Sequence, residues 1–301
     1  MIPPHLAQRQ ARYNGAAGTA WIAGLPALAA GCLDRWGLRL DGPSHSGMTA
    51  LVLPVRQGDG SAAVLKLQLV DEESRGEPLA LRIWAGRGAV RLLDHDPSTG
   101  ALLLERLDAG RPLTALPDET EALRILSELL ARLAAVPAPP GLRHLRDIAA
   151  AMLDAVPQAV ATLGDPAERA MVLRCAAMVR EVLSEPGDRL LHWDLHYDNV
   201  LAGAREPWLA IDPKPLAGDP GFELLPALHN RWDEVVASGD VGRAVLRRFD
   251  LMVEVLGLDR ERARAWTLGR VLQNVLWDIE DGEPAMSAVQ LAIAQALLSR
   301  R

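Results

Sequence analysis

Residues 192 to 200 read His192-Trp193-Asp194-Leu195-His196-Tyr197-Asp198-Asn199-Val200, and the interpretation of the whole chain starts from this stretch. It follows the apolar pair Leu190-Leu191 and precedes a short β-like run, Trp208-Leu209-Ala210-Ile211, which ends on Asp212. The pattern is H-x-D-x-x-x-x-N followed by a strand that ends in an acid. H-x-D-x-x-x-x-N alone has little specificity, and the acid after an apolar strand raises it.

These residue types in this order are the set that phosphoryl transfer needs. One carboxylate accepts the proton of an attacking hydroxyl, and an amide with a second carboxylate holds Mg²⁺ on the nucleotide phosphates. Asp194 is therefore the candidate base, and Asn199 and Asp212 are the candidate metal ligands. The expected cofactors are ATP and Mg²⁺.

Lysine usage identifies an upstream partner for this set. Of the 32 basic residues only Lys66 and Lys214 are lysine, so lysine is kept where arginine does not serve. Lys66 lies in an aliphatic run, residues 62–69, that predicts a strand, and Glu77 opens an amphipathic helical segment eleven residues later. The pair matches the strand lysine and helix glutamate of a kinase fold. The alternative is a surface lysine and a glutamate that merely starts a helix.

The composition is that of an ordinary cytoplasmic enzyme. The chain has 301 residues, 49% of them apolar, and a net charge of −7, which disfavours nucleic acid as the main partner. Cys32 and Cys175 lie far apart and indicate neither a disulfide framework nor a zinc site. No secretory signal is visible, and the apolar stretch 21–33 is too short to span a membrane. The oligomeric state is left open.

The order of expected elements predicts two lobes. Residues 1–36 look helical with a break at Gly15–Gly18, and strands and turns follow to residue 107, with a hairpin at 57–60. Beyond Asp108 the pattern is mostly helical, over 118–136, 143–162, 167–184, 221–237, 240–256, 259–280 and 284–299. We therefore predict an α+β, two-lobed protein-kinase-like fold, with a strand-rich N-terminal lobe (1–107) that binds nucleotide and a larger helical C-terminal lobe (108–301).

The chain resembles the aminoglycoside phosphotransferases, and most closely the branch with streptomycin 6-phosphotransferase and hydroxyurea phosphotransferase. The resemblance rests on residues 86–93, 101–107, 192–201 and 211–215. It implies that Glu105 and Leu107 offer a backbone carbonyl and amide to adenine, and that the loop around Ser46, Gly47 and Met48 covers the phosphates.

Departures from protein kinases favour a small-molecule kinase. The phosphate loop has one glycine, Trp193 replaces the arginine of H-R-D, and Pro213-Lys214 replaces Phe-Gly after the metal acid. No A-P-E segment follows, so control by loop phosphorylation is not indicated.

Carboxylates in the second lobe predict a cationic acceptor. Acids there would pair with guanidinium or ammonium groups, and streptomycin carries two guanidinium groups. The candidates are Asp219, Glu223, Asp233, Asp278, Glu280 and Asp281. The alternative for the cluster at 278–283 is a solvated helix end.

The leading hypothesis is an ATP-dependent phosphotransferase that inactivates streptomycin. The alternatives are a kinase for another small molecule, such as hydroxyurea, a sugar or an amino alcohol, and a nucleotide-binding pseudokinase module. A metal-dependent hydrolase built on His192 and Asp194 lacks further histidines at ligand spacing. His192 is expected to orient the loop, and Lys214 either contacts the γ-phosphate or pairs with Asp219.

Overall fold

The computed structural model describes residues 2–299, which form two compact units. The first holds the residues up to Ala109 together with Ala202–Leu209, and the second holds Gly110–Leu201 and the residues from Ala210 onward. The chain passes between the units within the short strands β7 (Asp108–Pro112), β10 (Val200–Ala202) and β11 (Trp208–Ala210). The predicted C-terminal lobe, 108–301, included 202–209; this segment instead belongs to the first unit, because Arg205 hydrogen-bonds Glu105 and Gly86.

The first unit is built on an antiparallel sheet in the order β1-β3-β4-β6-β5, with β2 paired to β3. The bounds are β1 (Arg39–Leu40), β2 (His45–Ser46), β3 (Ala50–Arg56), β4 (Ala62–Gln68), β5 (Leu92–Asp96) and β6 (Ala101–Glu105). The hairpin expected at 57–60 joins β3 and β4: Gln57 N donates to Ser61 O at 2.9 Å, and Gly60 has φ of 85°. Such a φ costs glycine little.

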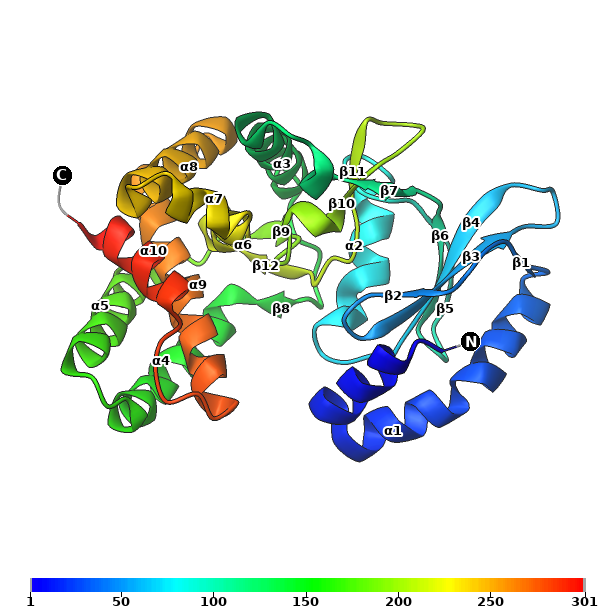
Figure 1. Ribbon diagram of the computed structural model, residues 1–301, viewed down its shortest axis with the longest axis horizontal. Coiled ribbons are helices and arrows are strands. Elements are labelled where there is room, and N and C mark those ends of the chain that lie inside the picture. The colour runs from blue at the N-terminus through cyan, green and yellow to red at the C-terminus, as the bar shows by residue number, and fades with distance from the viewer. Residues whose placement is uncertain (1, 300–301) are drawn as a thin grey trace. The chain divides into compact units, whose positions relative to one another are not determined.

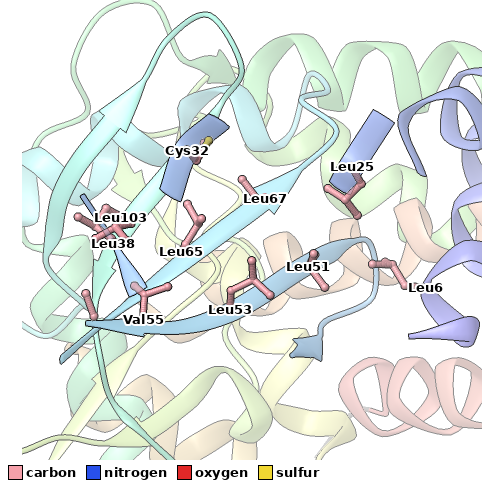
Figure 2. Close-up of a cluster of buried hydrophobic side chains, with 12 residues drawn as sticks. Leu6, Leu25, Cys32, Leu38, Leu51, Leu53, Val55, Leu65, Leu67 and Leu103 are labelled. Atoms are coloured by element: carbon pink, nitrogen blue, oxygen red, sulfur yellow. The ribbon is translucent and has the colours of Figure 1, made fainter. Parts of the chain in front are cut away.

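Side-chain alternation along β4 places two helices on opposite faces of this sheet. Ala63, Leu65 and Leu67 join a buried cluster with Leu6, Leu25 and Cys32 of α1 (Pro4–Arg35). Figure 2 shows these α1 side chains directed at the leucines of β3 and β4. Lys66 and Gln68 point to the other face, toward α2 (Glu77–Trp84), which follows a 3₁₀ turn at Ser74–Gly76.

Helix α1 is kinked where the sequence predicted a break. Gly15 has φ of 53° and ψ of −130°, and a Cβ on Gly18 would lie 2.1 Å from Gln10 O, so the two pieces meet closely at glycine. Helix character continues through Pro26, so α1 matches the helical region predicted over residues 1–36 and includes the apolar stretch 21–33. Among the described residues α1 alone has the length and apolar composition of a membrane span, and in the structure it covers the sheet (Figure 1).

The second unit is a helical domain with short strands at its centre. Its long helices are α3 (Glu119–Ala134), α4 (Leu145–Thr162), α5 (Pro166–Val182), α8 (Val241–Leu256), α9 (Arg260–Glu280) and α10 (Ala288–Leu298). Each of them matches a predicted helical segment. Helix α9 is the most buried, because it packs against α4, α5 and α10 and against the 3₁₀ turn Pro220–Glu223.

Residues 192–200 directly follow a strand of a small sheet in this unit. Strand β12 (Leu216–Gly218) lies between β8 (Arg143–His144) and β9 (Arg189–Leu191). The single helix expected over 221–237 is wrong: after the 3₁₀ turn come α6 (Leu224–His229) and α7 (Trp232–Ala237). They are separated because Arg231 adopts a left-handed φ of 48°, which no continuous helix allows.

Candidate active site

Lys66 and Glu77 form a buried ion pair within the first unit. Lys66 Nζ donates to both carboxylate oxygens of Glu77, at 2.8 and 2.7 Å, and Gln68 Nε2 donates to the same group at 2.8 Å. Glu77 has no exposed surface and Lys66 is 5% exposed. This excludes the surface-lysine alternative. A buried pair with an additional hydrogen bond holds the ammonium in one place.

The predicted adenine-contacting segment is fixed by the glutamate side chain. Glu105 accepts hydrogen bonds from Arg205 Nη2 at 2.9 Å and Nε at 3.2 Å, and from Arg91 N at 3.1 Å. Its backbone N–H donates to Arg91 O at 2.9 Å. These bonds hold the end of β6 at Glu105, two residues before Leu107, so the backbone predicted to contact adenine begins at a fixed position. The adenine contacts themselves remain a prediction.

The predicted phosphate loop is held by α1. Gly47 N donates to Ala50 O at 3.1 Å, and Gly47 O accepts from Arg9 Nη1 at 3.2 Å. His5 hydrogen-bonds the Ser46 hydroxyl. Met48 is 58% exposed. These contacts with α1 could not be predicted from the sequence, because the start of a helix and a loop some 40 residues later share no local pattern.

In the second unit the buried His192 side chain links the start of the segment 192–200 to Ile211, directly after strand β11. Its Nε2 donates to Ile211 O at 3.0 Å, and its Nδ1 accepts from Asp194 N at 3.4 Å. Burial lowers the pKa of His192 to about 3, so the ring is neutral at pH 7. The expected orienting role is consistent with these contacts, since a neutral ring bridges the loop to the strand end before Asp212.

Trp193 occupies a constrained position just before the candidate base. Its φ is 67°, and its N–H donates to Glu223 Oε1 at 2.5 Å. Guanidinium groups lie over the indole ring, with Arg270 at 4.4 Å and Arg143 at 4.5 Å from the ring centroid. These cation–π contacts hold the indole ring in place next to Asp194.

Asn199 is hydrogen-bonded to Asp194 and to Ile211, the residue before Asp212. Asn199 Nδ2 donates to Asp194 O at 2.9 Å, and Ile211 N donates to Asn199 O at 2.9 Å. Asp212 has φ of 57° and pairs with Lys214, whose Nζ lies 3.0 Å from Oδ1. Lys214 thus pairs with Asp212, and the alternative of a pair with Asp219 is wrong.

Asp194 opens onto a cavity of about 290 Å³ within the second unit. The other lining residues are His196, Pro226, His229, Asn230, Arg270 and Asn274. Burial raises the pKa of Asp194, and the neighbouring Asp212 acts in the same direction, while His196, Lys214 and Arg270 oppose the rise. A carboxylate with a raised pKa is a stronger proton acceptor while it stays ionised.

Comparison with known proteins identifies a family of kinases, in agreement with the phosphoryl-transfer residues described above. A model of the aminoglycoside/hydroxyurea antibiotic resistance kinases matches residues 35–282. The chain belongs to this family. It is 60% identical to streptomycin 6-kinase of Streptomyces glaucescens, over 98% of this chain and 96% of that protein. It is 59% identical to hydroxyurea phosphotransferase of Kitasatospora aureofaciens, over 99% and 86% respectively.

Solved structures show the same fold. An aminoglycoside phosphotransferase in a ternary complex with ADP and hygromycin B has a TM-score of 0.61 at 19% identity, covering 90% of this chain and 99% of that one. APH(3'')-Id from Streptomyces rimosus, in complex with ADP and streptomycin, has a TM-score of 0.53 at 20% identity, over 84% and 99%. The predicted kinase-like fold and the class of ATP-dependent small-molecule phosphotransferase are therefore confirmed, and the pseudokinase and hydrolase alternatives lose their basis.

The six acids predicted to bind substrate do not form one group in this kinase. Asp219 caps Gly221 N at 2.8 Å and pairs with Arg262, and Glu223 is fully buried against Trp193. Both are engaged in holding the loop and the 3₁₀ turn. Asp233, Glu280 and Asp281 are exposed, and Asp278 is half-buried. None of the six lines the cavity at Asp194.

The cavity contains residues that sequence reasoning did not select. His229, Asn230, Arg270 and Asn274 come from α6, the turn after it, and α9. The only local sign in the sequence is that these positions are polar, although the residues around them in the helices are apolar. That signal is common at helix surfaces, so it does not by itself mark a site.

Proposed function

We propose that this kinase transfers the γ-phosphate of ATP to a hydroxyl of streptomycin and so inactivates the antibiotic. The observation that carries the proposal is the cavity beside Asp194, in a chain that is 60% identical to a streptomycin 6-kinase over nearly its whole length. Streptomycin is a multi-ring molecule larger than this cavity. The ring with the accepting hydroxyl would enter it, and the remainder would lie outside.

Asp194 would act as the general base. The acceptor O–H gives its proton to the Asp194 carboxylate as the oxygen bonds to the γ-phosphorus, the bond from that phosphorus to the β–γ bridging oxygen breaks, and ADP leaves. Arg270, Lys214 and His196 favour the ionised carboxylate. Burial, the largest influence on Asp194, raises its pKa, and these three groups oppose that rise.

The residues present fit a magnesium ion bound with nucleotide. Asn199 uses its amide N–H on Asp194 O, which leaves its Oδ1 as an acceptor, and Asp212 supplies a carboxylate from the adjoining segment. Mg²⁺ uses few protein ligands when phosphates supply the others. When bound, Mg²⁺ would neutralise charge on the phosphate oxygens.

Lys66 is proposed to contact the nucleotide phosphates, positioned by Glu77. Glu105 and Leu107 would hold the adenine edge through their backbone, and the loop Ser46–Met48 would cover the phosphates. The support is the ion pair, the bonds to Glu105, and the link between Arg9 and the loop. A cytoplasmic location follows from the ATP requirement, because ATP is supplied inside the cell.

Hydroxyurea is a second candidate acceptor. The chain is almost as similar to a hydroxyurea phosphotransferase as to a streptomycin 6-kinase, and a cavity of about 290 Å³ holds such a small molecule entirely. The two proposals share the chemistry at Asp194. They differ in the acceptor: part of streptomycin would lie outside the cavity, whereas hydroxyurea would lie entirely inside it.

The deciding experiment is a coupled ATP-consumption assay with streptomycin, hydroxyurea, hygromycin B and no acceptor. We expect streptomycin to increase ADP release strongly, and mass spectrometry to show addition of one phosphoryl group. The Asp194→Asn variant is the control for contaminating kinases. Turnover with hydroxyurea alone would replace the first proposal by the second, and turnover with neither would refute both.

A further inference from the structure

The cavity at Asp194 presents neutral polar groups where the sequence predicted acids. Its lining includes the side chains of His229, Asn230 and Asn274, and Arg270 is the cation of fixed charge among its lining residues. A guanidinium or ammonium group of a substrate gains no ion pair from these groups. The one carboxylate that lines the cavity, Asp194, is the candidate base.

Asn230 is held in one orientation. Its Oδ1 accepts from Tyr197 N at 3.2 Å, its backbone oxygen accepts from Arg248 Nη1 at 2.5 Å, and its backbone N–H donates to Ala227 O at 3.2 Å. The Nδ2 group is buried and has no hydrogen-bond partner among the described residues. Because the oxygen is used by Tyr197, the amide can serve the cavity only as a donor.

His229 directly precedes Asn230, and its side chain also carries a buried polar nitrogen. Its Nε2 is buried and also has no hydrogen-bond partner within residues 2–299. Burial, with a further contribution from Arg270, lowers the pKa of His229 to about 4, so the imidazole is neutral at pH 7. A neutral ring offers a hydrogen bond to an uncharged group and no net charge to an anion or cation.

Two adjacent buried groups with unused hydrogen-bonding capacity indicate a polar ligand. Leaving such a group unsatisfied costs about 1–3 kcal/mol, so native structures rarely keep two together without a purpose. A hydroxyl oxygen accepts from the Asn230 amide, and a hydroxyl both donates to and accepts from a neutral imidazole. A guanidinium has only donors and cannot satisfy Asn230 Nδ2.

We propose that Asn230 and His229 are specificity-determining residues that bind hydroxyl oxygens of the acceptor ring next to the hydroxyl facing Asp194. The cavity selects the uncharged polyol edge of the acceptor, and positively charged substituents stay outside it. This inference rests on the proposed function and deepens it, since it assigns the part of the acceptor that the cavity holds. It also accounts for the position of the predicted acids away from the cavity.

The test measures Michaelis constants for streptomycin and ATP in Asn230→Ala, His229→Leu and His229→Gln, with Asn14→Ala as a matched control in the first unit. Asn14 Nδ2 donates to Gln10 Oε1 at 2.8 Å, far in sequence from the cavity residues. We expect Asn230→Ala and His229→Leu to raise the streptomycin KM about three- to tenfold, with the ATP KM within about twofold. Gln at 229 can donate and accept, so His229→Gln should recover most of the loss.

The dependence of KM on ionic strength distinguishes recognition of the acceptor by neutral groups from recognition by charged groups. The ratio of variant to wild-type KM should be the same at low and high NaCl, because bonds between neutral groups are not screened. Thermal melting checks the fold, which matters most for Asn230→Ala because that change also removes the partner of Tyr197 N–H. His229→Leu leaves that bond in place and provides the independent measurement.

Three results would overturn the inference while the proposed function stands: an unchanged streptomycin KM in both removal variants, a fall in kcat alone, or a KM ratio that disappears in high salt. If the wild type accepts hydroxyurea and not streptomycin, the first proposed function fails. The same variants are then measured with hydroxyurea, whose neutral carbonyl and hydroxyl oxygens belong to the same chemical class, and the same criteria apply.

Discussion

The side-chain amide of Asn199 donates a hydrogen bond to the backbone carbonyl of Asp194 at 2.9 Å, which couples the candidate metal ligand to the candidate base. The bond fixes the Asn199 side chain so that its oxygen remains available as a ligand, and it fixes the peptide that follows Asp194. Substitutions at these two positions should therefore have different kinetic effects, although the residues are in contact.

Asp194→Asn should reduce kcat by roughly 10²–10⁴-fold and leave ATP affinity nearly unchanged, because the carboxylate acts on the acceptor proton. The substitution keeps the shape of the side chain, so the melting temperature should change little. Steady-state kinetics and nucleotide titration measure the two quantities. A variant that keeps near-normal kcat would refute the assignment of the base.

Asn199→Ala should lower both the affinity for Mg·ATP and kcat, since it removes a ligand and also releases the Asp194 peptide. Asp212→Ala should weaken Mg·ATP binding at least as much, because it removes the carboxylate ligand. Isothermal titration with ATP, with and without Mg²⁺, separates these effects. Unchanged magnesium dependence in both variants would show that the metal is held elsewhere.

Lys66→Arg should impair ATP binding although the charge is kept. A guanidinium is wider than the ammonium that Glu77 holds at 2.7 and 2.8 Å, so it cannot occupy the same buried space. Glu77→Gln should also weaken ATP binding, because it leaves a buried ammonium without a counter-ion. The exposed pair Arg260 and Asp250 serves as the control, where Arg260→Lys should have little effect on affinity or melting.

The predicted substrate acids should divide into two groups. Asp219→Asn should lower stability by about 1–2 kcal/mol and leave the streptomycin KM unchanged, because Asp219 pairs with Arg262 inside the fold. Asp278→Asn should leave stability unchanged, and it should raise the streptomycin KM only if the acids around 278–281 bind the cationic part of the substrate. Urea unfolding and kinetics at two salt concentrations distinguish a structural, a contacting and a steering role.

His192 should make the kinase less stable in acid. An unfolded histidine binds a proton below a pKa of about 6.5, whereas the folded pKa is about 3, so the contribution to stability is lost as pH falls from 6.5 toward 3. Glu223 acts in the opposite direction, since its folded pKa of about 7 lies above the ordinary value of 4.5. Comparing wild type with His192→Gln by urea unfolding at several pH values isolates the histidine. If both lose stability equally between pH 6.5 and 4.5, His192 is not the cause.

The order of elements and the phosphoryl-transfer residues could be predicted from the sequence because both depend on local patterns. Hydrophobic periodicity marks the long helices, alternation marks β3 and β4, and the spacing from His192 to Asn199 identifies the loop. Lys66 and Glu77 could be paired because the first lies on a strand and the second opens the next helix, and the structure joins them at 2.7 Å.

The tertiary structure alone decided which polar residues meet in space. Asp219 and Glu223 are predicted from the sequence to face a cationic acceptor, yet they are buried, because the fold places Arg262 and the Trp193 N–H beside them. Arg205 joins the first unit, and Arg9 reaches the loop at Gly47, through contacts between segments far apart in the chain. His229, Asn230 and Arg270 likewise surround Asp194 only after α6 and α9 have packed. A charge or amide carries no sequence signal for its partner when that partner is distant in the chain, so local chemistry could be predicted and the acceptor cavity could not.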